Sequence, residues 1–405
     1  MAFKKAAFIC PYCFAEHKLT NARFRCTNRR CKDVDDVEMT RYENGDTNKP
    51  KRGKNCFSAS SKNPLSLPKS AECPECKQKS FKVVCPSCHN TLPESTLLGR
   101  DMVISVVGAR DTGKSHFVGV IIRELIERIS VKFGGAMVAF DDSMKRYELN
   151  YGHRLYVDLQ KLDLTQSSEH NVNNGAYRPL IFTLNMKNKS FFGDSIDSFT
   201  FVFFDTAGED LNELDTMSTV NKYICKSAGI IFLLDPMQIP AVANQFDETS
   251  IKQASSVGWR HATRSDDIMA RVSTLIRNDK NINTNQKINT PVAAVFSKFD
   301  AIVPIVPKEC LILDQSSHCD AGAFVMSDWH NVNTEVQNLL KAWGAASFIQ
   351  QLEINYTNYS CFVASSLGLG NSPRSDNRID RPRPHRIEDA LLWILKENKV
   401  IKSRK

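Results

Sequence analysis

Two groups of residues in this chain of 405 residues have the types and the spacing that chemistry requires. The first is the segment GARDTGKS at positions 108–115, which matches the pattern G-x-x-x-x-G-K-[ST] at every fixed position. Glycines let such a loop wrap around a phosphate, so that backbone amides and the N-terminus of the next helix donate to its oxygens. Lys114 would then reach the β- and γ-phosphates of a nucleotide, and the hydroxyl of Ser115 would bind Mg²⁺. The expected nucleotide contacts in this loop are Gly108, Arg110, Asp111, Thr112, Gly113, Lys114, Ser115 and His116.

Apolar runs define the elements that must position this loop. Residues 102–107 predict a buried parallel strand in front of it, and residues 116–129 carry apolar side chains at helical spacing behind it. A strand, a glycine-bounded loop and a helix, in that order, are the setting in which this pattern binds phosphate. The sequence therefore favours a nucleoside triphosphate site over the alternative, a glycine turn without a ligand. Another buried strand is predicted at 229–234, and it ends at Asp235 without an obvious ligand.

A strand predicted at 201–204 ends at Asp205, and Gly208 follows three residues later. A carboxylate in that place can hold Mg²⁺, usually through water, and the glycine can present its amide to the γ-phosphate. Thr165, which precedes another predicted strand, is the candidate for a threonine that completes the Mg²⁺ site. Together with Ser115 and Asp205, it forms the predicted magnesium site.

Two later segments have the residues needed to read a base. A strand predicted at 291–296 leads into the segment SKFD, which contains Lys298 and Asp300 and is similar to the [NT]-K-x-D motif of GTPases. In that motif the carboxylate accepts hydrogen bonds from N1–H and the 2-amino group of guanine, which adenine does not offer in that arrangement, and the lysine stem packs against the ring. The last predicted strand ends in Ser365 and Ser366, similar to the loop whose backbone amide recognises the guanine O6.

Taken in order, these motifs resemble a GTPase of the TRAFAC class, which includes Ras-like proteins and translation factors, over roughly residues 102–399. The resemblance implies an α/β fold, a three-layer sandwich with a mostly parallel sheet, that binds GTP and GDP with Mg²⁺ and hydrolyses GTP as a regulatory switch. Phrases at 229–239 and 386–395 are similar to the bacterial double-GTPase (DO-GTPase) group. That similarity implies a component of a multi-gene bacterial conflict system, with protein partners from the same system.

The chain departs from the family pattern at the reacting phosphate. The resemblance assigns catalysis to Lys114, Asp205, Gly208 and Glu209, but Glu209 replaces the usual water-orienting glutamine. Arg110 stands where Ras-like enzymes have glycine; it either obstructs hydrolysis, offsets γ-phosphate charge as an arginine in cis, or is a solvated loop residue. We expect slow hydrolysis. The alternative is a scaffold or nucleic-acid-binding protein whose nucleotide site hardly hydrolyses.

The second chemical group consists of cysteines in four pairs within the first 88 residues. A C-P-x-C turn aims two thiolates at one ion, and a second pair closes a tetrahedral site, so eight cysteines predict two zinc ions. Disulfides are the alternative, but no leader-like apolar core precedes the cysteines. The predicted ligands are Cys10, Cys13, Cys26, Cys31, Cys73, Cys76, Cys85 and Cys88.

The spacing leaves the pairing of these cysteines open. The first four and the last four can each form a site, or Cys10 and Cys13 can close on Cys85 and Cys88 around an insertion. Cys56 has no partner in either scheme. His17 and His89 lie near the pairs in sequence and are expected to be solvated.

Composition and charge complete the expected organisation. Residues 1–97 predict a double zinc-ribbon module with a basic, polar loop at about 44–70, and residues 98–405 predict the GTPase domain with insertions, including a helical one at 136–165. The module carries all of the excess positive charge of the chain, whose net value is +8, so the two candidate roles for it are docking to protein and contact with nucleic acid. No apolar run is long enough for a transmembrane helix, and a cytoplasmic protein is expected. Because every nucleotide motif follows the module, the two parts are expected to act independently.

Overall fold

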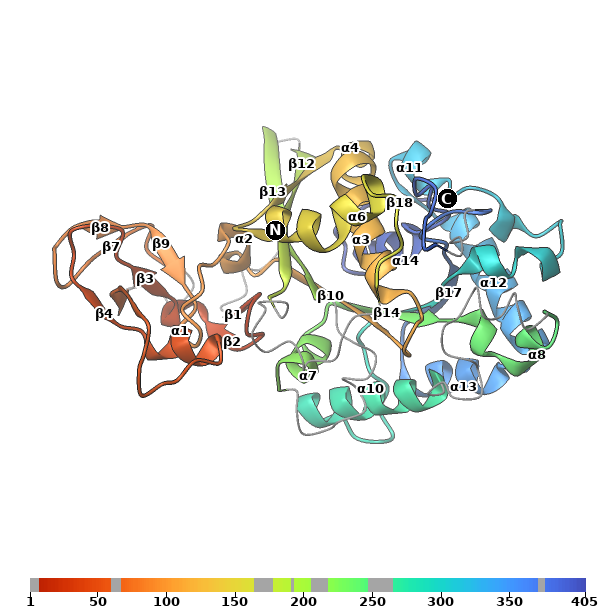
Figure 1. Cartoon of the computed structure of the whole chain (residues 1–405), viewed down its shortest axis with the longest axis horizontal. Coiled ribbons are helices and arrows are strands. Elements are labelled where there is room, and N and C mark those ends of the chain that lie inside the picture. Colours follow the sequence, from red (N-terminus) through yellow and green to blue (C-terminus); the bar gives the residue numbers. More distant parts are fainter. Residues whose placement is uncertain are drawn as a thin grey trace.

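The computed structural model describes residues 7–59, 67–163, 178–190, 193–204, 218–246, 265–370 and 376–405. Figure 1 shows a small module of short strands at one end of the molecule and a larger domain with a central sheet beside it. The chain enters the larger domain through α2 (Glu94–Leu97), which ends where the sequence predicts the module to end.

Seven strands form the central sheet, in the order β11-β12-β13-β10-β14-β15-β17. Their bounds are β10 (Asp101–Gly108), β11 (Gly135–Ala139), β12 (Leu180–Ser190), β13 (Gly193–Phe204), β14 (Gly229–Leu234), β15 (Val292–Phe296) and β17 (Tyr359–Val363). β10 pairs in parallel with β13 on one side and with β14 on the other, and β15 and β17 extend the parallel part. β12 runs antiparallel to both of its neighbours. The structure therefore confirms the expected α/β fold with a mostly parallel sheet.

Helices cover both faces of this sheet. α7 (Ser218–Cys225), α10 (Ser265–Lys280) and α13 (Ala346–Asn355) lie along one face, whereas α3 (Lys114–Glu124) and α14 (Asp389–Glu397) lie along the other (Figure 1). α12 (Met326–Ala342) packs against β17 at the edge. Helix α14 is apolar all round and buried from Ala390 to Leu395, as a helix enclosed by other elements must be.

The helical insertion predicted at 136–165 is only partly helical. Its first part is not helical but forms the edge strand β11, which buries Met137 and exposes Ala136 and Val138. Only one face of this strand packs, so it lacks the continuous apolar run that marks the central strands. Helical turns follow it, at α5 (Ser143–Tyr147), Glu148–Gly152 and α6 (His153–Tyr156). Helix α3 continues through Leu125–Ile129 into α4 (Ser130–Lys132).

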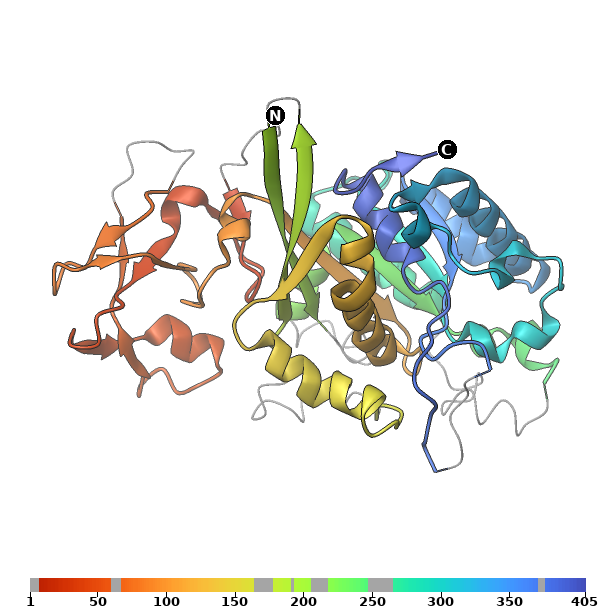
Figure 2. The same ribbon diagram turned by 90° about the horizontal axis from the view of Figure 1, so that it is seen from above.

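Short strands build the cysteine-rich module. β1 (Ala7–Ile9) pairs with β2 (Glu16–Lys18), and β3 (Arg23–Arg25) lies between β6 (Cys56–Ser58) and β9 (Lys82–Val84). The remaining elements of the module are β4 (Asp33–Asp35), α1 (Val37–Tyr42), β5 (Arg52–Lys54), β7 (Ala71–Glu72) and β8 (Lys79–Ser80). Figures 1 and 2 both place the module at the β13 side of the sheet, far from α12 and α13.

Small elements complete the larger domain. They are α8 (Pro240–Ala243), α11 (His318–Ala321), β16 (Phe324–Val325), β18 (Ser403–Arg404) and 3₁₀ turns at Pro236–Gln238, Phe299–Ala301, Val303–Ile305 and Leu311–Leu313. A further 3₁₀ turn, at Leu19–Asn21, belongs to the cysteine-rich module. Within the described ranges, no helix combines the length and the apolar character needed to cross a bilayer.

Candidate functional site

The phosphate-loop segment joins the central strand β10 to the N-terminus of α3. Both of its end glycines are required by the backbone. A Cβ added to Gly108 would lie 2.7 Å from the carbonyl oxygen of Leu233 on β14, and Gly113 has a φ of 83° at the start of the helix. Asp111 also adopts a left-handed conformation, with a φ of 63°. The loop is thus tightly curved at the carboxyl end of the sheet.

The lysine of this loop is held against the loop backbone. Lys114 is 7% exposed, and its ammonium donates to the carbonyl oxygens of Gly108 at 3.0 Å and Ala109 at 2.8 Å. Thr112 is buried and its hydroxyl donates to the Ala109 carbonyl oxygen. Arg110 is exposed at the surface of the loop, where its carbonyl oxygen accepts from the side chain of Gln238.

The two residues after the lysine occupy the first turn of α3. Ser115 is half-buried there. The Nε2 atom of His116 accepts a hydrogen bond from the amide of Leu162 at 3.1 Å. Burial, together with the nearby Lys298 cation, lowers the pKa of His116 to about 4, so the ring is neutral at pH 7 and can accept this bond. The side chain of His116 therefore links the first turn of α3 to the backbone at Leu162.

Lys298 links the phosphate loop to the predicted base-reading segment. Its ammonium lies 2.9 Å from a carboxylate oxygen of Asp235, at the end of β14, and 3.5 Å from one of Asp111 in the loop. The side chain of Asp235 is fully buried, and burial raises its pKa while Lys298 opposes that rise. Although burial opposes its charge, the carboxylates of Asp235 and Asp111 raise the pKa of Lys298. Sequence reasoning missed the role of Asp235, because a single carboxylate after a strand has no characteristic spacing.

The two predicted base-reading segments meet at Asp300. The hydroxyl of Ser365 donates to Oδ1 of Asp300 at 2.5 Å, and burial raises the pKa of Asp300 above its ordinary value. The Ser365 hydroxyl also accepts from the amide of Gly368 at 3.0 Å, which fixes the turn that contains Ser366. The structure therefore places Asp300 and Ser365 in direct contact, and Lys298, two residues before Asp300, contacts Asp111 of the phosphate loop.

Four predicted residues lie outside the described part of the chain. They are Thr165, Asp205, Gly208 and Glu209. The described chain reaches Phe204 at the end of β13, where it pairs with Ser105 of β10, three positions before Gly108. Asp205, Gly208 and Glu209 thus follow, in sequence, a strand that adjoins the strand of the phosphate loop.

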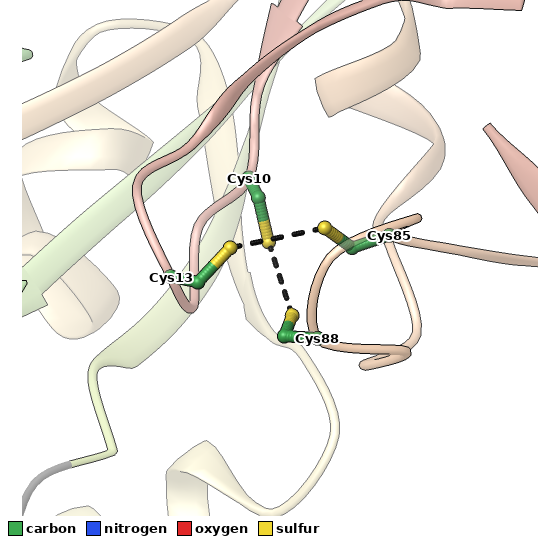
Figure 3. A group of neighbouring side chains, drawn as sticks. All are labelled: Cys10, Cys13, Cys85 and Cys88. Atoms are coloured by element: carbon green, nitrogen blue, oxygen red, sulfur yellow. Dashed lines mark hydrogen bonds between the residues drawn. The ribbon is translucent and has the colours of Figure 1, made fainter. Parts of the chain in front are cut away.

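The first cysteine group resolves the pairing question. Cys10 Sγ lies 3.7 Å from Cys88 Sγ, and Cys13 Sγ lies 3.8 Å from Cys85 Sγ (Figure 3). Two thiolates bound to one tetrahedral zinc at about 2.3 Å lie about 3.8 Å apart, whereas disulfide sulfurs lie about 2.05 Å apart. The crossed arrangement is therefore confirmed, sequential pairing is wrong, and the geometry fits a metal ion rather than disulfides.

The second group lies in the segment between Cys13 and Cys85, which separates the two cysteine pairs (knuckles) of the first group. Cys26 Sγ is 3.6 Å from Cys76 Sγ, and Cys31 Sγ is 4.0 Å from Cys73 Sγ. In each group all four ligand atoms lie within 4.8 Å of one another. Hydrogen bonds from the backbone amide of Gln78 and from the side chain of Asn28 lower the pKa of Cys76 to about 6 and so favour the thiolate that zinc requires. The two groups can hold two zinc ions.

His17 is not simply solvated. Its Nε2 lies 3.5 Å from Cys85 Sγ, and the thiols of Cys13 and Cys85 raise the pKa of this half-buried ring to about 9. A protonated His17 would donate to a ligand sulfur and offset part of its negative charge, as groups around metal ligands commonly do.

A third cluster joins Asp36, Cys56 and His89. His89 is 5% exposed and its Nδ1 lies 2.6 Å from Oδ1 of Asp36, so the expectation of a solvated histidine is wrong. Arg25 donates to Oδ2 of Asp36 and to Cys56 Sγ, and Arg23 lies 3.1 Å from the Nε2 of His89. Guanidinium groups thus contact all three side chains and hold the cluster together by hydrogen bonds.

The comparisons with known proteins give one similarity. No protein-family model matches the chain. The chain is 25% identical over 349 residues to the "Putative ESX-1 scaffolding and assembly protein SaeC" of Mycolicibacterium smegmatis (strain ATCC 700084 / mc(2)155), a similarity that covers 81% of this chain and 83% of that protein. This span is longer than residues 98–405 alone, so the similarity includes part of the cysteine-rich module.

Proposed function

We propose that this chain binds guanine nucleotide and Mg²⁺ at the carboxyl end of β10 and acts as a slowly hydrolysing GTP switch. The observation that carries the proposal is the junction at Lys298, whose ammonium contacts the phosphate-loop residue Asp111 and the buried Asp235. One side chain thus connects the segment that would bind phosphate with the segment that would read the base.

The topology of the sheet supports a ligand at this edge. The chain passes from β10 towards β13 on one side of the sheet and then to β14 on the other side. In parallel α/β sheets, ligands bind outside the carboxyl ends of the strands at such a reversal of strand order. The phosphate loop leaves the sheet at this point, and its curvature directs amides and the N-terminus of α3 to the same place.

The base site has the acceptor that guanine requires. Asp300 offers a half-buried carboxylate, fixed by Ser365, that could accept from N1–H and the 2-amino group. A purine without these donors would leave this acceptor unpaired once the nucleotide covers it, which costs binding free energy. GTP is therefore the proposed triphosphate.

A single-turnover measurement of GTP hydrolysis distinguishes the proposed switch from a scaffold that binds nucleotide but hardly hydrolyses it. Because Glu209 can hold a water molecule but repels a developing anion, we expect GTP conversion on the order of 10⁻⁴ s⁻¹, comparable to an unassisted small GTPase. Radiolabelled phosphate release from GTP mixed with excess protein measures this rate. Tight GTP binding with no release over a day would favour a scaffold that binds nucleotide without hydrolysis.

The similarity to SaeC favours protein partners. That protein is named for scaffolding and assembly, and the resemblance to the DO-GTPase group implies a component of a multi-gene system. Under this proposal the nucleotide state controls which protein surfaces the chain presents. A permanent scaffold, in which the nucleotide only stabilises the fold, is the second candidate.

Two zinc ions are proposed to hold the module together. Metal analysis of the purified chain should give about two zinc per molecule, the number that eight thiolates in closed four-ligand sites allow. Substituting Cys26 and Cys76 with serine should leave about one. A metal content near zero, or disulfide-linked cysteines in protein from reducing cytosol, would contradict this prediction.

A further inference from the structure

The loop of the first cysteine knuckle packs against the α/β domain. Phe14, directly after Cys13, is completely buried, and its ring centroid lies 5.2 Å from that of Tyr223 in α7 and 5.9 Å from that of Phe204 in β13. Tyr12, between Cys10 and Cys13, is 1% exposed. Both aromatic residues belong to the same apolar core as the central sheet.

Phe14 contacts Phe204 and Tyr223, and these two residues attach the end of β13 to β10. Phe204 is the last residue of β13 and immediately precedes Asp205 in the sequence. The hydroxyl of Tyr223 accepts from the amide of Phe204 at 3.3 Å and donates to the carbonyl oxygen of Ile104 in β10. Phe14 therefore packs on Tyr223, whose hydroxyl joins β13 to β10. β13 leads to the predicted Mg²⁺ ligand Asp205, and β10 leads to the phosphate loop.

Besides Tyr42 of the module, Tyr12 contacts residues that lie next to β11 and β12 in the sequence. Its hydroxyl donates to a carboxylate oxygen of Asp141 at 3.2 Å, and the guanidinium of Arg178 lies over its ring at 5.5 Å from the centroid. Arg178 also pairs with Asp141 at 3.6 Å and Asp142 at 3.5 Å. The chain continues from Arg178 directly into β12, the neighbour of β13.

The second cysteine group makes a contrast within the same module. Cys26, Cys31 and Cys73 form a small core with Phe24 and Phe57 that is separate from the core of the sheet. Among the described residues, the side chains packed around this small core also come from the module itself. The module thus contains one cysteine group that adjoins the α/β domain and one that does not.

We infer that Tyr12 and Phe14, held in place by metal in the first cysteine group, are positioning residues of the nucleotide site. This inference rests on the proposed function. Metal at the first cysteine group fixes the loop that carries Tyr12 and Phe14. These two side chains in turn fix Arg178, before β12, and Phe204, at the end of β13 next to the strand that leads into the phosphate loop. Metal binding at the first group and nucleotide binding are therefore coupled, and by linkage each strengthens the other. The second group is not coupled. This conclusion replaces the sequence-based expectation that the module and the domain act independently.

Matched cysteine substitutions in the full, zinc-loaded chain test the coupling. Cys13→Ser with Cys88→Ser should weaken GTP binding at least tenfold, whereas Cys26→Ser with Cys76→Ser should change it less than twofold. Phe14→Ala, which leaves all ligands intact, should weaken GTP binding, and Phe14→Leu should restore most of it. Equal effects of the two cysteine pairs would overturn the inference.

Zinc release can be measured on the wild-type chain, so this test of the coupling does not require that a substituted chain folds. A chromogenic chelator should remove two zinc ions, and saturating GTP should slow the release of one of them at least tenfold. In the Cys13→Ser, Cys88→Ser chain the remaining ion should leave at a rate that GTP does not change. GTP that binds the wild type without altering either release rate would refute the coupling while leaving the proposed function intact. A wild-type chain that binds no GTP would refute both.

Discussion

Replacing Asp300 with asparagine should move the preference of this chain from GTP to xanthosine triphosphate. The carboxylate of Asp300 is half-buried and fixed by Ser365, so it can accept from both guanine donors without reorganisation. An asparagine keeps one acceptor but presents an N–H where the 2-amino group of guanine would donate, and that N–H matches the 2-carbonyl of xanthine. Sites built on such hydrogen bonds reject a mismatched analogue strongly, so GTP affinity should fall by about 100-fold or more.

Competition between labelled GTP and unlabelled nucleotides measures this change in specificity. The control is Asp267→Asn, which removes one exposed carboxylate on α10 and should leave GTP binding unchanged. An Asp300→Asn chain that still prefers GTP over xanthosine triphosphate would show that the base is read elsewhere.

Replacing Lys114 with alanine should remove triphosphate binding, lowering GTP affinity by about 100-fold or more. Lys114 is the ammonium that the loop holds against the carbonyl oxygens of Gly108 and Ala109. No neutral side chain can offset the charge that a triphosphate brings to this place, and charge-assisted hydrogen bonds to phosphate are among the strongest in proteins. Equilibrium titration with a fluorescent GTP analogue measures the loss.

The fold and the metal content provide the internal check on that variant. Circular dichroism and zinc content should match those of the wild type, because Lys114 donates to carbonyl oxygens of its own loop and lies outside the cysteine-rich module. Lys341→Ala, at an exposed position of α12, is the matched control and should bind GTP normally. GTP hydrolysis that persists unchanged in Lys114→Ala would place the activity at another site.

The central strands were predictable because burial on both faces requires apolar runs. The runs at 102–107, 229–234 and 361–364 correspond to β10, β14 and β17, each bounded by turn residues. The edge strand β11 was not predictable in this way. Only Met137 of its middle residues is buried, so pairing with β12 determines its conformation more than its own pattern does.

The candidate site was predictable where its residues are close in sequence. The phosphate loop and the C-P-x-C knuckles are local patterns, and their spacing predicts their chemistry. The pairing of knuckles depends instead on tertiary structure. β9 pairs with β3, which carries Cys85 and Cys88 back to Cys10 and Cys13 and leaves the second group in the insertion.

The partners of Lys298 could not be derived from sequence for the same reason. Asp235 and Lys298 belong to neighbouring strand ends, and only the parallel pairing of β14 with β15 brings them within 2.9 Å. The packing of Phe14 on Phe204 likewise joins residues that no sequence pattern relates.

The central claim is that the site at the carboxyl end of β10 selects guanine nucleotide. The most direct test is a calorimetric titration of the purified, zinc-loaded wild-type chain with GTP and with ATP, each in excess Mg²⁺. We expect one site per chain, with GTP bound about 100-fold or more tightly than ATP, because only guanine offers both donors to the carboxylate of Asp300. Equal affinity for the two nucleotides, or no binding of either, would contradict it.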